Sequence, residues 1–353
     1  MIGPLLLAGI LAAAPGGFRE ARPGYRFQFP RDHGAHPDFA LEWWYFTGHL
    51  WSRDGTRRYG YQLTFFRRAL PVQGWRGNPA WRCDQVLLAH AALTDVGAGR
   101  FAVEERLNRE GIPAAAALGD LDLRDASWSA RRARGGRIHL SFSVGLAALD
   151  LDLDPATPPV VFGENGVSRK GADPAAASHY LTFPRLASAG TLRLPGREEA
   201  VQGQSWMDHE FSSGQLAPGQ VGWDWAGIQL LDGRSLMVYR LRDAEGAQDP
   251  WSTLAEVDAG GRIRRTTHDF RWTGGSWASP ASGARYPLPA TLRAWGETWT
   301  LEPLVADQEL RTRLGPAVTY WEGACRVRDG QGAEVGDAYV ELTGYAHSMQ
   351  GRF

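Results

Sequence analysis

Short apolar runs, separated by Gly, Asp and Pro, follow one another along most of the chain. Many alternate apolar with polar positions, and turn residues such as those at 54–55 and 232–233 end them. Runs of this length between turn residues are typical of β-strands. The pattern predicts strands at 41–51, 59–67, 85–94, 138–144, 190–194, 222–231, 235–242, 252–257, 263–272, 291–301, 320–328 and 338–345.

The clearest local prediction is a β-hairpin that joins 222–231 to 235–242 through Asp232-Gly233-Arg234. Long helical periodicity is scarce, and 103–117 is expected to hold a short helix or an irregular loop. This pattern favours an all-β chain of antiparallel barrels or sandwiches over alternating strands and helices.

Length and charge indicate a two-domain protein that does not bind nucleic acid or anionic membranes through its net charge. The 353 residues suffice for two domains, each with its own core. A formal net charge of −1 supplies no electrostatic attraction to nucleic acid or to an anionic membrane. The 15 tryptophans indicate broad apolar surfaces that must be covered or must hold a ligand. The expected partner is therefore an apolar small molecule.

The amino terminus is apolar from residue 5 to residue 14 and rich in Leu and Ala. Such a run is too short to span a bilayer but suits the hydrophobic part of a signal peptide, here residues 1–16. No later run is apolar enough for a membrane span. We expect a periplasmic or secreted protein whose mature chain has no transmembrane segment.

Two cysteines and several missing motifs limit the cofactors. Cys83 and Cys325 either pair in an oxidising compartment or remain separate thiols. The sequence has no C-x-x-C and no H-E-x-x-H spacing, so it predicts no metal site. It also has neither a P-loop nor a G-x-G-x-x-G after a strand. The expected chemistry uses no cofactor.

The strand at 41–51 carries the first group of candidate residues. Alternation places Tyr45 and His49 on one face and Glu42 on the other. One interpretation puts Tyr45 and His49 in a ligand cavity. The other is a strand packed on both faces, with Glu42 tied to an arginine such as Arg67.

Three consecutive titratable residues, Asp208, His209 and Glu210, stand between aromatic residues. On an extended chain Asp208 and Glu210 point one way and His209 the other. A carboxyl group in apolar surroundings has a raised pKa and can donate a proton. We therefore expect Asp208 or Glu210 to be the proton donor and His209 a base or a water-positioning group. The alternative is a polar interdomain turn whose charges pair with arginines.

The predicted hairpin strand at 222–231 is the third candidate region. Trp223, Trp225 and Gln229 share a face, and an indole face can stabilise a cation. Together with Asp224 they are predicted to bind the ligand. The alternative is a core wall in which Asp224 pairs with Arg240.

These segments, in this order, resemble the family of AttH-like proteins and carotenoid 1,2-hydratases. The resemblance runs from about 36 to 345. It rests on the segments 41–50, 59–67, 180–192, 205–213, 222–242, 320–323 and 339–345. It implies two tandem lipocalin-like antiparallel β-barrel domains, at 30–212 and 213–348. Many family members look like secreted proteins without an assigned activity.

Hydratases of this family carry a His-x-Trp element and a later Tyr-x-Asp element. His209 and Tyr239 match the first position of each, whereas Phe211 and Leu241 replace the Trp and the Asp. The resemblance therefore adds Tyr239 to the catalytic candidates. A hydratase must protonate a C=C bond, hold the carbocation against an aromatic face and deliver water.

Three functions follow from these observations. The leading hypothesis is an exported, cofactor-free enzyme of the hydratase or lyase type that holds an apolar small molecule near the domain junction. The second is a non-catalytic lipocalin-like binding or carrier protein of the cell envelope, in which the charged residues only join the two barrels. The third, a secreted hydrolase, would use Ser205 or Ser212 near His209, but no G-x-S-x-G motif supports it.

Overall fold

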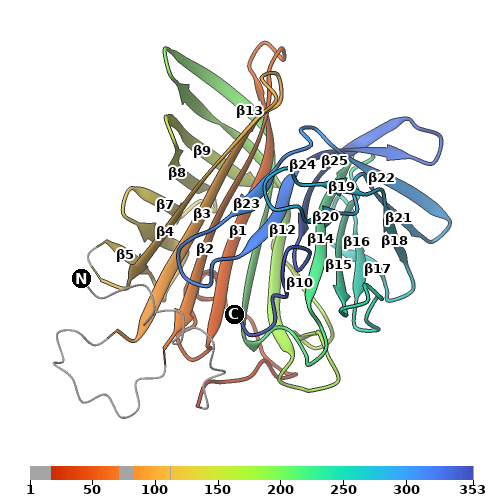
Figure 1. Ribbon diagram of the computed structural model, residues 1–353. Coiled ribbons are helices and arrows are strands. Elements are labelled where there is room, and N and C mark those ends of the chain that lie inside the picture. The colour runs from red at the N-terminus through yellow and green to blue at the C-terminus, as the bar shows by residue number, and fades with distance from the viewer. Residues whose placement is uncertain (1–16, 71–82, 112, 353) are drawn as a thin grey trace.

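The computed structural model describes residues 17–70, 83–111 and 113–352, and this part of the chain is almost entirely β (Figure 1). Its one helical element is the 3₁₀ turn η1 (Arg31–His33). None of the described residues forms a helix long and apolar enough to cross a membrane. The predicted all-β class is confirmed, while the predicted signal peptide at 1–16 lies outside the described residues.

The first sheet has 13 antiparallel strands in the order β4-β3-β2-β1-β13-β12-β9-β8-β7-β6-β5, with β10 and β11 paired to β12. Its strands are β1 (Leu41–Ser52), β2 (Arg58–Ala69), β3 (Gln85–Asp95), β4 (Arg100–Arg109), β5 (Ala114–Ala116), β6 (Asp122–Asp125), β7 (Trp128–Arg132), β8 (Ile138–Val144), β9 (Ala147–Pro155), β10 (Val160–Phe162), β11 (Ser168–Arg169), β12 (Ala177–Leu194) and β13 (Arg197–Gly214). The first strand, β1, pairs along its length with the last, β13.

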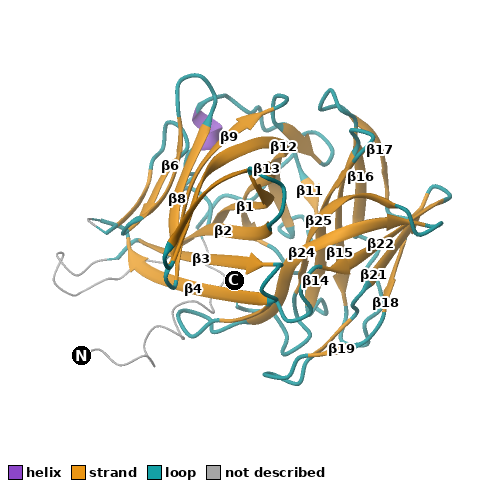
Figure 2. Cartoon of the chain, turned by 90° about the horizontal axis from the view of Figure 1, so that it is seen from above, coloured by secondary structure: helices purple, strands orange, loops and turns teal. Residues whose placement is uncertain are grey.

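The second sheet has ten strands in the order β17-β16-β15-β14-β25-β24-β22-β21-β18, with β23 paired to β24. Its strands are β14 (Gly222–Leu230), β15 (Ser235–Arg242), β16 (Thr253–Val257), β17 (Ile263–Thr267), β18 (Arg271–Gly274), β21 (Ala290–Ala294), β22 (Glu297–Pro303), β23 (Glu309–Arg311), β24 (Thr319–Asp329) and β25 (Glu334–Leu342); β19 (Trp277–Ala278) and β20 (Arg285–Tyr286) pair separately. Each sheet curves round its own core (Figure 2), as expected for tandem lipocalin-like barrels. The exact domain limits, 30–212 and 213–348, stay a prediction.

Most strand predictions agree with the structure; two of them, and the one segment expected to be a helix or loop, do not. The predicted hairpin forms, with β14 and β15 in antiparallel register. The expected helix or loop at 103–117 is wrong, because β4 and β5 occupy most of it. β4 is an edge strand without a buried residue, so its apolar pattern is weak. The single strand expected at 291–301 is instead a hairpin, turning at Trp295-Gly296 with φ of 53° and 80°. The strand expected at 263–272 divides into β17 and β18, at opposite ends of the sheet.

Each barrel is filled by its own apolar side chains. Trp44, Phe65 and Trp128 belong to the core inside the first sheet. Ile228 and Trp321 belong to a separate core inside the second. Successive side chains of a strand point to opposite faces of its sheet. The side chains of β1, β2, β13 and β14 that do not enter a barrel core therefore form the contact between the two domains.

The outer faces of the two sheets meet through β2 with β24, β1 with β25 and β12 with β14. The backbones approach closely at Gly60, where an added Cβ would lie 2.6 Å from the Cβ of Ala324. A side chain at this position would push the domains apart. The junction is therefore a packed interface between two filled barrels.

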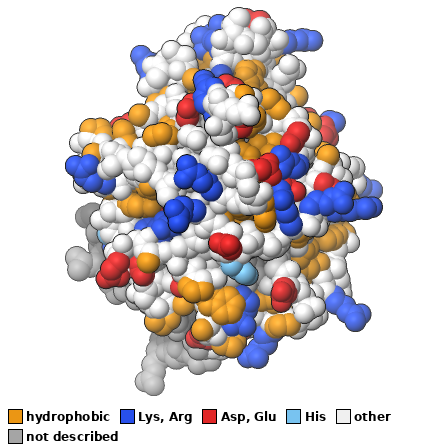
Figure 3. All heavy atoms as spheres, turned by 90° about the vertical axis from the view of Figure 1, so that its right-hand side faces the viewer, with side chains coloured by type: hydrophobic (Ala, Val, Ile, Leu, Met, Phe, Trp, Pro, Cys, Tyr) orange, Lys and Arg blue, Asp and Glu red, His pale blue; other side chains and the backbone are white. Residues whose placement is uncertain are grey.

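The two cysteines lie apart in the fold, and charges of both signs lie on the surface. Cys83 and Cys325 are both free, so of the two alternatives the structure has separate thiols. On the face shown in Figure 3, basic and acidic side chains are interspersed.

Candidate functional site

A cavity with a volume of about 130 Å³ lies between the two domains. Its walls come from both sheets and include six aromatic side chains near the candidate residues, Trp43, Tyr45, Tyr180, Trp223, Trp225 and Tyr239. Polar and charged side chains, among them Asp208, Glu210, Glu322 and Glu341, also line it. An apolar pocket into which polar groups converge is typical of small-molecule sites.

Several predicted site residues meet in this cavity. Asp208 and Glu210 line it, because alternate residues of β13 face it. Tyr45, Trp223, Trp225 and Tyr239 line it as well. His209, between the two acids, points to the opposite face of β13 and contacts Glu42 there.

Three residues predicted to bind the ligand lie outside the cavity lining, because their polar groups join other parts of the protein. The His49 ring contacts the carbonyl oxygen of Ala338 at 2.9 Å. Asp224 accepts a hydrogen bond from Arg240 at 2.7 Å, which is the alternative that the sequence left open. The Gln229 amide donates to two backbone carbonyl groups, at 2.8 and 2.9 Å.

Asp208 is a buried carboxylate surrounded by neutral donors. The Tyr180 hydroxyl donates to Oδ2 at 2.7 Å, and the Trp206 indole and the Thr182 hydroxyl donate to Oδ1. Burial raises the pKa of Asp208 to about 7, although these three donors act in the opposite direction. Both oxygens of this group are therefore used as acceptors, and its charge is poised near neutral pH.

Glu210 has a cation beside it. Its Oε1 forms an ion pair with Lys170, the only lysine of the chain. The Lys170 ammonium lies 5.1 Å from the centre of the Tyr239 ring, within the range of a cation–π contact. The Tyr239 hydroxyl donates to the carbonyl oxygen of Arg169 at 3.1 Å and so holds the segment that carries this lysine. Sequence reasoning missed Lys170, because only the fold brings it to Glu210.

Two more carboxyl groups, missed by the sequence analysis, enter the cavity from the second sheet. Glu322 on β24 and Glu341 on β25 are directly opposed in register. Burial raises the pKa of Glu341 to about 7, against the effect of the Trp223 indole that donates to it at 2.8 Å. Burial also raises the pKa of Glu322 well above its usual value, and the Glu341 carboxyl raises it further. The signal for both was a Glu that follows a large apolar or aromatic pair, Tyr320-Trp321 and Tyr339-Val340.

His90 adds a neutral base to the wall. Its Nδ1 lies 2.8 Å from the Tyr320 hydroxyl, and burial lowers the pKa of the imidazole to about 4. His90 is therefore uncharged at neutral pH and can act only as a hydrogen-bond partner there.

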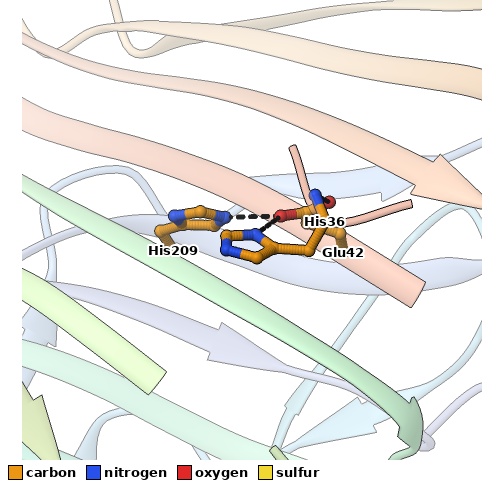
Figure 4. A group of neighbouring side chains, drawn as sticks. All are labelled: His36, Glu42 and His209. Atoms are coloured by element: carbon orange, nitrogen blue, oxygen red, sulfur yellow. Dashed lines mark hydrogen bonds and ion pairs between the residues drawn. The ribbon is translucent and has the colours of Figure 1, made fainter. Parts of the chain in front are cut away.

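A second buried polar cluster, His36, Glu42 and His209, lies on the other face of β1 and β13 (Figure 4). Glu42 Oε1 contacts His36 Nδ1 at 2.7 Å and His209 Nε2 at 2.8 Å. The Arg67 guanidinium donates to Glu42 Oε2 at 2.8 Å, so the predicted Glu42–Arg67 pair is present. Arg67 and the two histidines hold the pKa of Glu42 well below its usual range despite complete burial.

One ligand atom from each of His36, Glu42 and His209 lies within 4.8 Å of the others, a spacing that a metal ion could use. However, Arg67 already supplies positive charge to the same carboxylate. Phe211 also stacks on His36, with ring centres 3.6 Å apart. The donor set therefore suits a hydrogen-bond network that fixes the segment before β1, and it fits a metal ion poorly.

Comparisons with known proteins place this geometry in a family. The AttH-like family matches residues 20–345. The structure of an AttH from Nitrosomonas europaea is 34% identical and superimposes with a TM-score of 0.84, covering 93% of this chain and 100% of that one. No curated protein matches the chain in sequence.

Two more distant structures share the fold alone. Kievitone hydratase from Nectria haematococca is 14% identical with a TM-score of 0.69, covering 94% of this chain and 98% of its own. CghA with Sch210972 is 13% identical with a TM-score of 0.51, covering 87% and 89%. The family match over most of the length and the 34% identity to the Nitrosomonas protein agree with each other. The chain belongs to the AttH-like family.

Proposed function

We propose that the junction cavity binds an apolar small molecule and catalyses the cofactor-free addition of water to a C=C bond, or the reverse elimination. The observation that carries this proposal is the aromatic cavity between two filled barrels, into which carboxyl groups with raised pKa values project. A carboxyl group that titrates near neutral pH can give or take a proton during turnover. The shared fold with a kievitone hydratase supports the same class of reaction.

The proposed reaction needs no redox group. A proton adds to one carbon of the alkene, water attacks the other, and a base removes one proton from the attacking water. The electron-rich faces of Trp223 and Trp225 stabilise the intermediate carbocation. A trisubstituted alkene, such as a prenyl group, fits best because its protonation gives a tertiary cation.

We assign Asp208 the role of the base. Its oxygens accept three hydrogen bonds, which suits a carboxylate better than the proton donor that the sequence suggested. Glu210 keeps its partner Lys170 in place, and Tyr239 supports that pair. The predicted role of His209 in turnover stays a prediction, since its ring lies on the other face of β13. Export of the protein belongs to the same proposal and rests on the apolar residues 5–14.

The test uses the full chain, H₂¹⁸O and a panel of apolar alkenes that includes geraniol and prenylated phenols. We expect wild-type protein to give hydrated products that carry ¹⁸O. Asp208→Asn should lower kcat/KM at least about 100-fold, the usual scale for losing an acid or base. Asp125→Asn is the matched control, because Asp125 is also a buried aspartate with a raised pKa but lies outside the cavity. Binding of the panel without ¹⁸O incorporation would overturn the proposal and favour a carrier protein.

A further inference from the structure

Glu322 and Glu341 form a pair of carboxyl groups on one wall of the cavity. Directly opposed residues of antiparallel strands point to the same face, with Cβ atoms about 5 Å apart. Glu322 is buried, and both residues line the cavity. No cation pairs with either carboxylate among the ion pairs of the described residues. Two carboxyl groups this close in an apolar site do not both ionise at neutral pH.

Unpartnered polar atoms distinguish Glu322 from Asp208 and Glu210 in the cavity. Glu322 Oε1 and the Tyr45 hydroxyl are buried and make no hydrogen bond of good geometry in the described part of the chain, although the Tyr45 and Tyr320 hydroxyls lie close enough to Glu322 to lower its pKa. Buried polar atoms in native proteins almost always have a partner, so an unpartnered atom in a cavity points to a ligand. By contrast, Asp208 accepts three hydrogen bonds and Glu210 has Lys170. Glu322 Oε1 is therefore available to a ligand.

We infer that Glu322 and Glu341 share one proton and that Glu322 donates it to the C=C bond of the ligand. This inference rests on the proposed function and names its acid. The O–H bond of Glu322 breaks as the new C–H bond forms, and the cation then takes water. The proton that this water loses passes to Asp208 and returns to the pair through solvent, so no other reactant is needed.

The placement of acid and base supports this assignment. Asp208 projects from β13 of the first sheet, whereas Glu322 projects from β24 of the second. Tyr45 is the register partner of Asp208 on β1, and its hydroxyl lowers the pKa of Glu322 against the effect of burial. A ligand between the sheets would therefore meet the acid and the base from opposite walls, an arrangement that suits anti addition of H and OH to neighbouring carbons.

The first experiment needs no substrate. Full-length protein labelled with ¹³C at the glutamate carboxyl carbons is titrated by NMR. The titratable groups around the pair are Tyr45, Tyr320, Tyr339, Asp208, Glu210 and Lys170. We expect two coupled titrations, at least one of them far above the usual value of about 4.3. Removing the neighbouring charge with Glu341→Gln should lower the midpoint of Glu322 by at least about one pH unit.

Glu309→Gln is the matched control, because Glu309 is a buried glutamate hydrogen-bonded to Ser279 and Tyr286 and lies outside the cavity. It should leave both midpoints unchanged. Titration of both carboxyl groups near the usual value would overturn the inference. So would an unchanged Glu322 midpoint in Glu341→Gln, a result that does not depend on whether Glu322→Gln folds.

The second experiment measures turnover of geraniol. Glu322→Gln should lower kcat by about 10²- to 10⁴-fold, the range for a general acid, and leave the dissociation constant for geraniol within about 2-fold. Retained kcat in Glu322→Gln would overturn the assignment of the acid. If the wild type hydrates neither geraniol nor the rest of the panel, the proposed function fails, and the assignment of the acid fails with it. The titration then decides separately whether the two carboxyl groups share a proton.

Discussion

Two buried polar clusters lie on opposite faces of the same strands, β1 and β13, and burial affects their acids in opposite ways. Glu42 is fully buried, yet its pKa lies well below its usual range, because Arg67 and two histidines surround it. Asp208 is also buried, and its pKa rises to about 7, because its direct partners are neutral hydroxyl and indole groups. At similar burial, the presence of an adjacent cation decides whether the acid keeps its charge.

This difference separates a structural cluster from a reactive one. The Glu42 cluster joins the segment before β1 to the first sheet, since the Arg67 guanidinium also donates to the carbonyl oxygens of His36 and Phe39. Within the described part of the chain, the carboxyl groups of the cavity have no adjacent cation of this kind, apart from Glu210 with Lys170. Titratable groups with strongly shifted pKa values are common at functional sites. Substitutions on the two faces should therefore change different quantities.

The largest expected effect is on stability, from Arg67→Met. This change leaves the buried Glu42 carboxylate without its guanidinium, and breaking a buried ion pair in this way costs about 3–5 kcal/mol. Urea denaturation measures the loss. The double variant Glu42→Gln/Arg67→Met removes both charges and should recover part of it. A loss below about 1 kcal/mol, typical of an exposed pair, would show that the cluster is not closed to water.

The next effect is the pH dependence of stability, which should have opposite signs for the two faces. The pKa of Asp208 is about 7 in the fold, against a usual value of 3.8. Its contribution is therefore complete below about pH 4 and is lost as the pH rises to about 7, with a slope of at most about 1.4 kcal/mol per pH unit. The pKa of Glu42 is lowered, so its contribution is present above pH 4.5 and is lost as the pH falls.

Unfolding free energies from urea titrations between about pH 2 and about pH 8 test this sign. Asp208→Asn should flatten the decline of wild-type stability across this range. Glu42→Gln should leave the decline in place and remove the loss at lower pH. The comparison fails if the unfolding free energy of Asp208→Asn falls with pH as steeply as that of the wild type.

Sequence alternation was enough to place Asp208 and His209 on opposite faces, because it depends only on neighbouring residues. It was also enough for the hairpin of β14 and β15. It did not bring Lys170 to Glu210, since that contact depends on how distant segments pack. Nor did it pair Glu322 with Glu341, which depends on the register of β24 and β25.

The position of His49 could not be predicted from the sequence for the same reason. His49 shares a face with Tyr45, as predicted, but lies further along β1, where the second sheet packs directly on it. Its ring therefore contacts a backbone carbonyl group instead of the cavity. Position along the strand relative to the partner domain decides this outcome, and local sequence contains no information about that position.

The smallest expected effect is on the protonation of Glu341 in Trp223→Phe. The Trp223 indole donates to Glu341 at 2.8 Å, and a donor stabilises the charged form of a carboxyl group. A neutral hydrogen bond contributes about 1 kcal/mol, so its loss should raise the pKa of Glu341 by up to about one unit. Carbon-13 NMR of the labelled protein measures this shift.

The control variant is on the opposite face. Trp44 stacks on His209 with ring centres 4.7 Å apart and donates to the His33 carbonyl oxygen, so Trp44→Phe should leave the titration of Glu341 unchanged. A lowered or unchanged pKa in Trp223→Phe would mean that charges, and not neutral donors, set the protonation state on the cavity face as they do at Glu42.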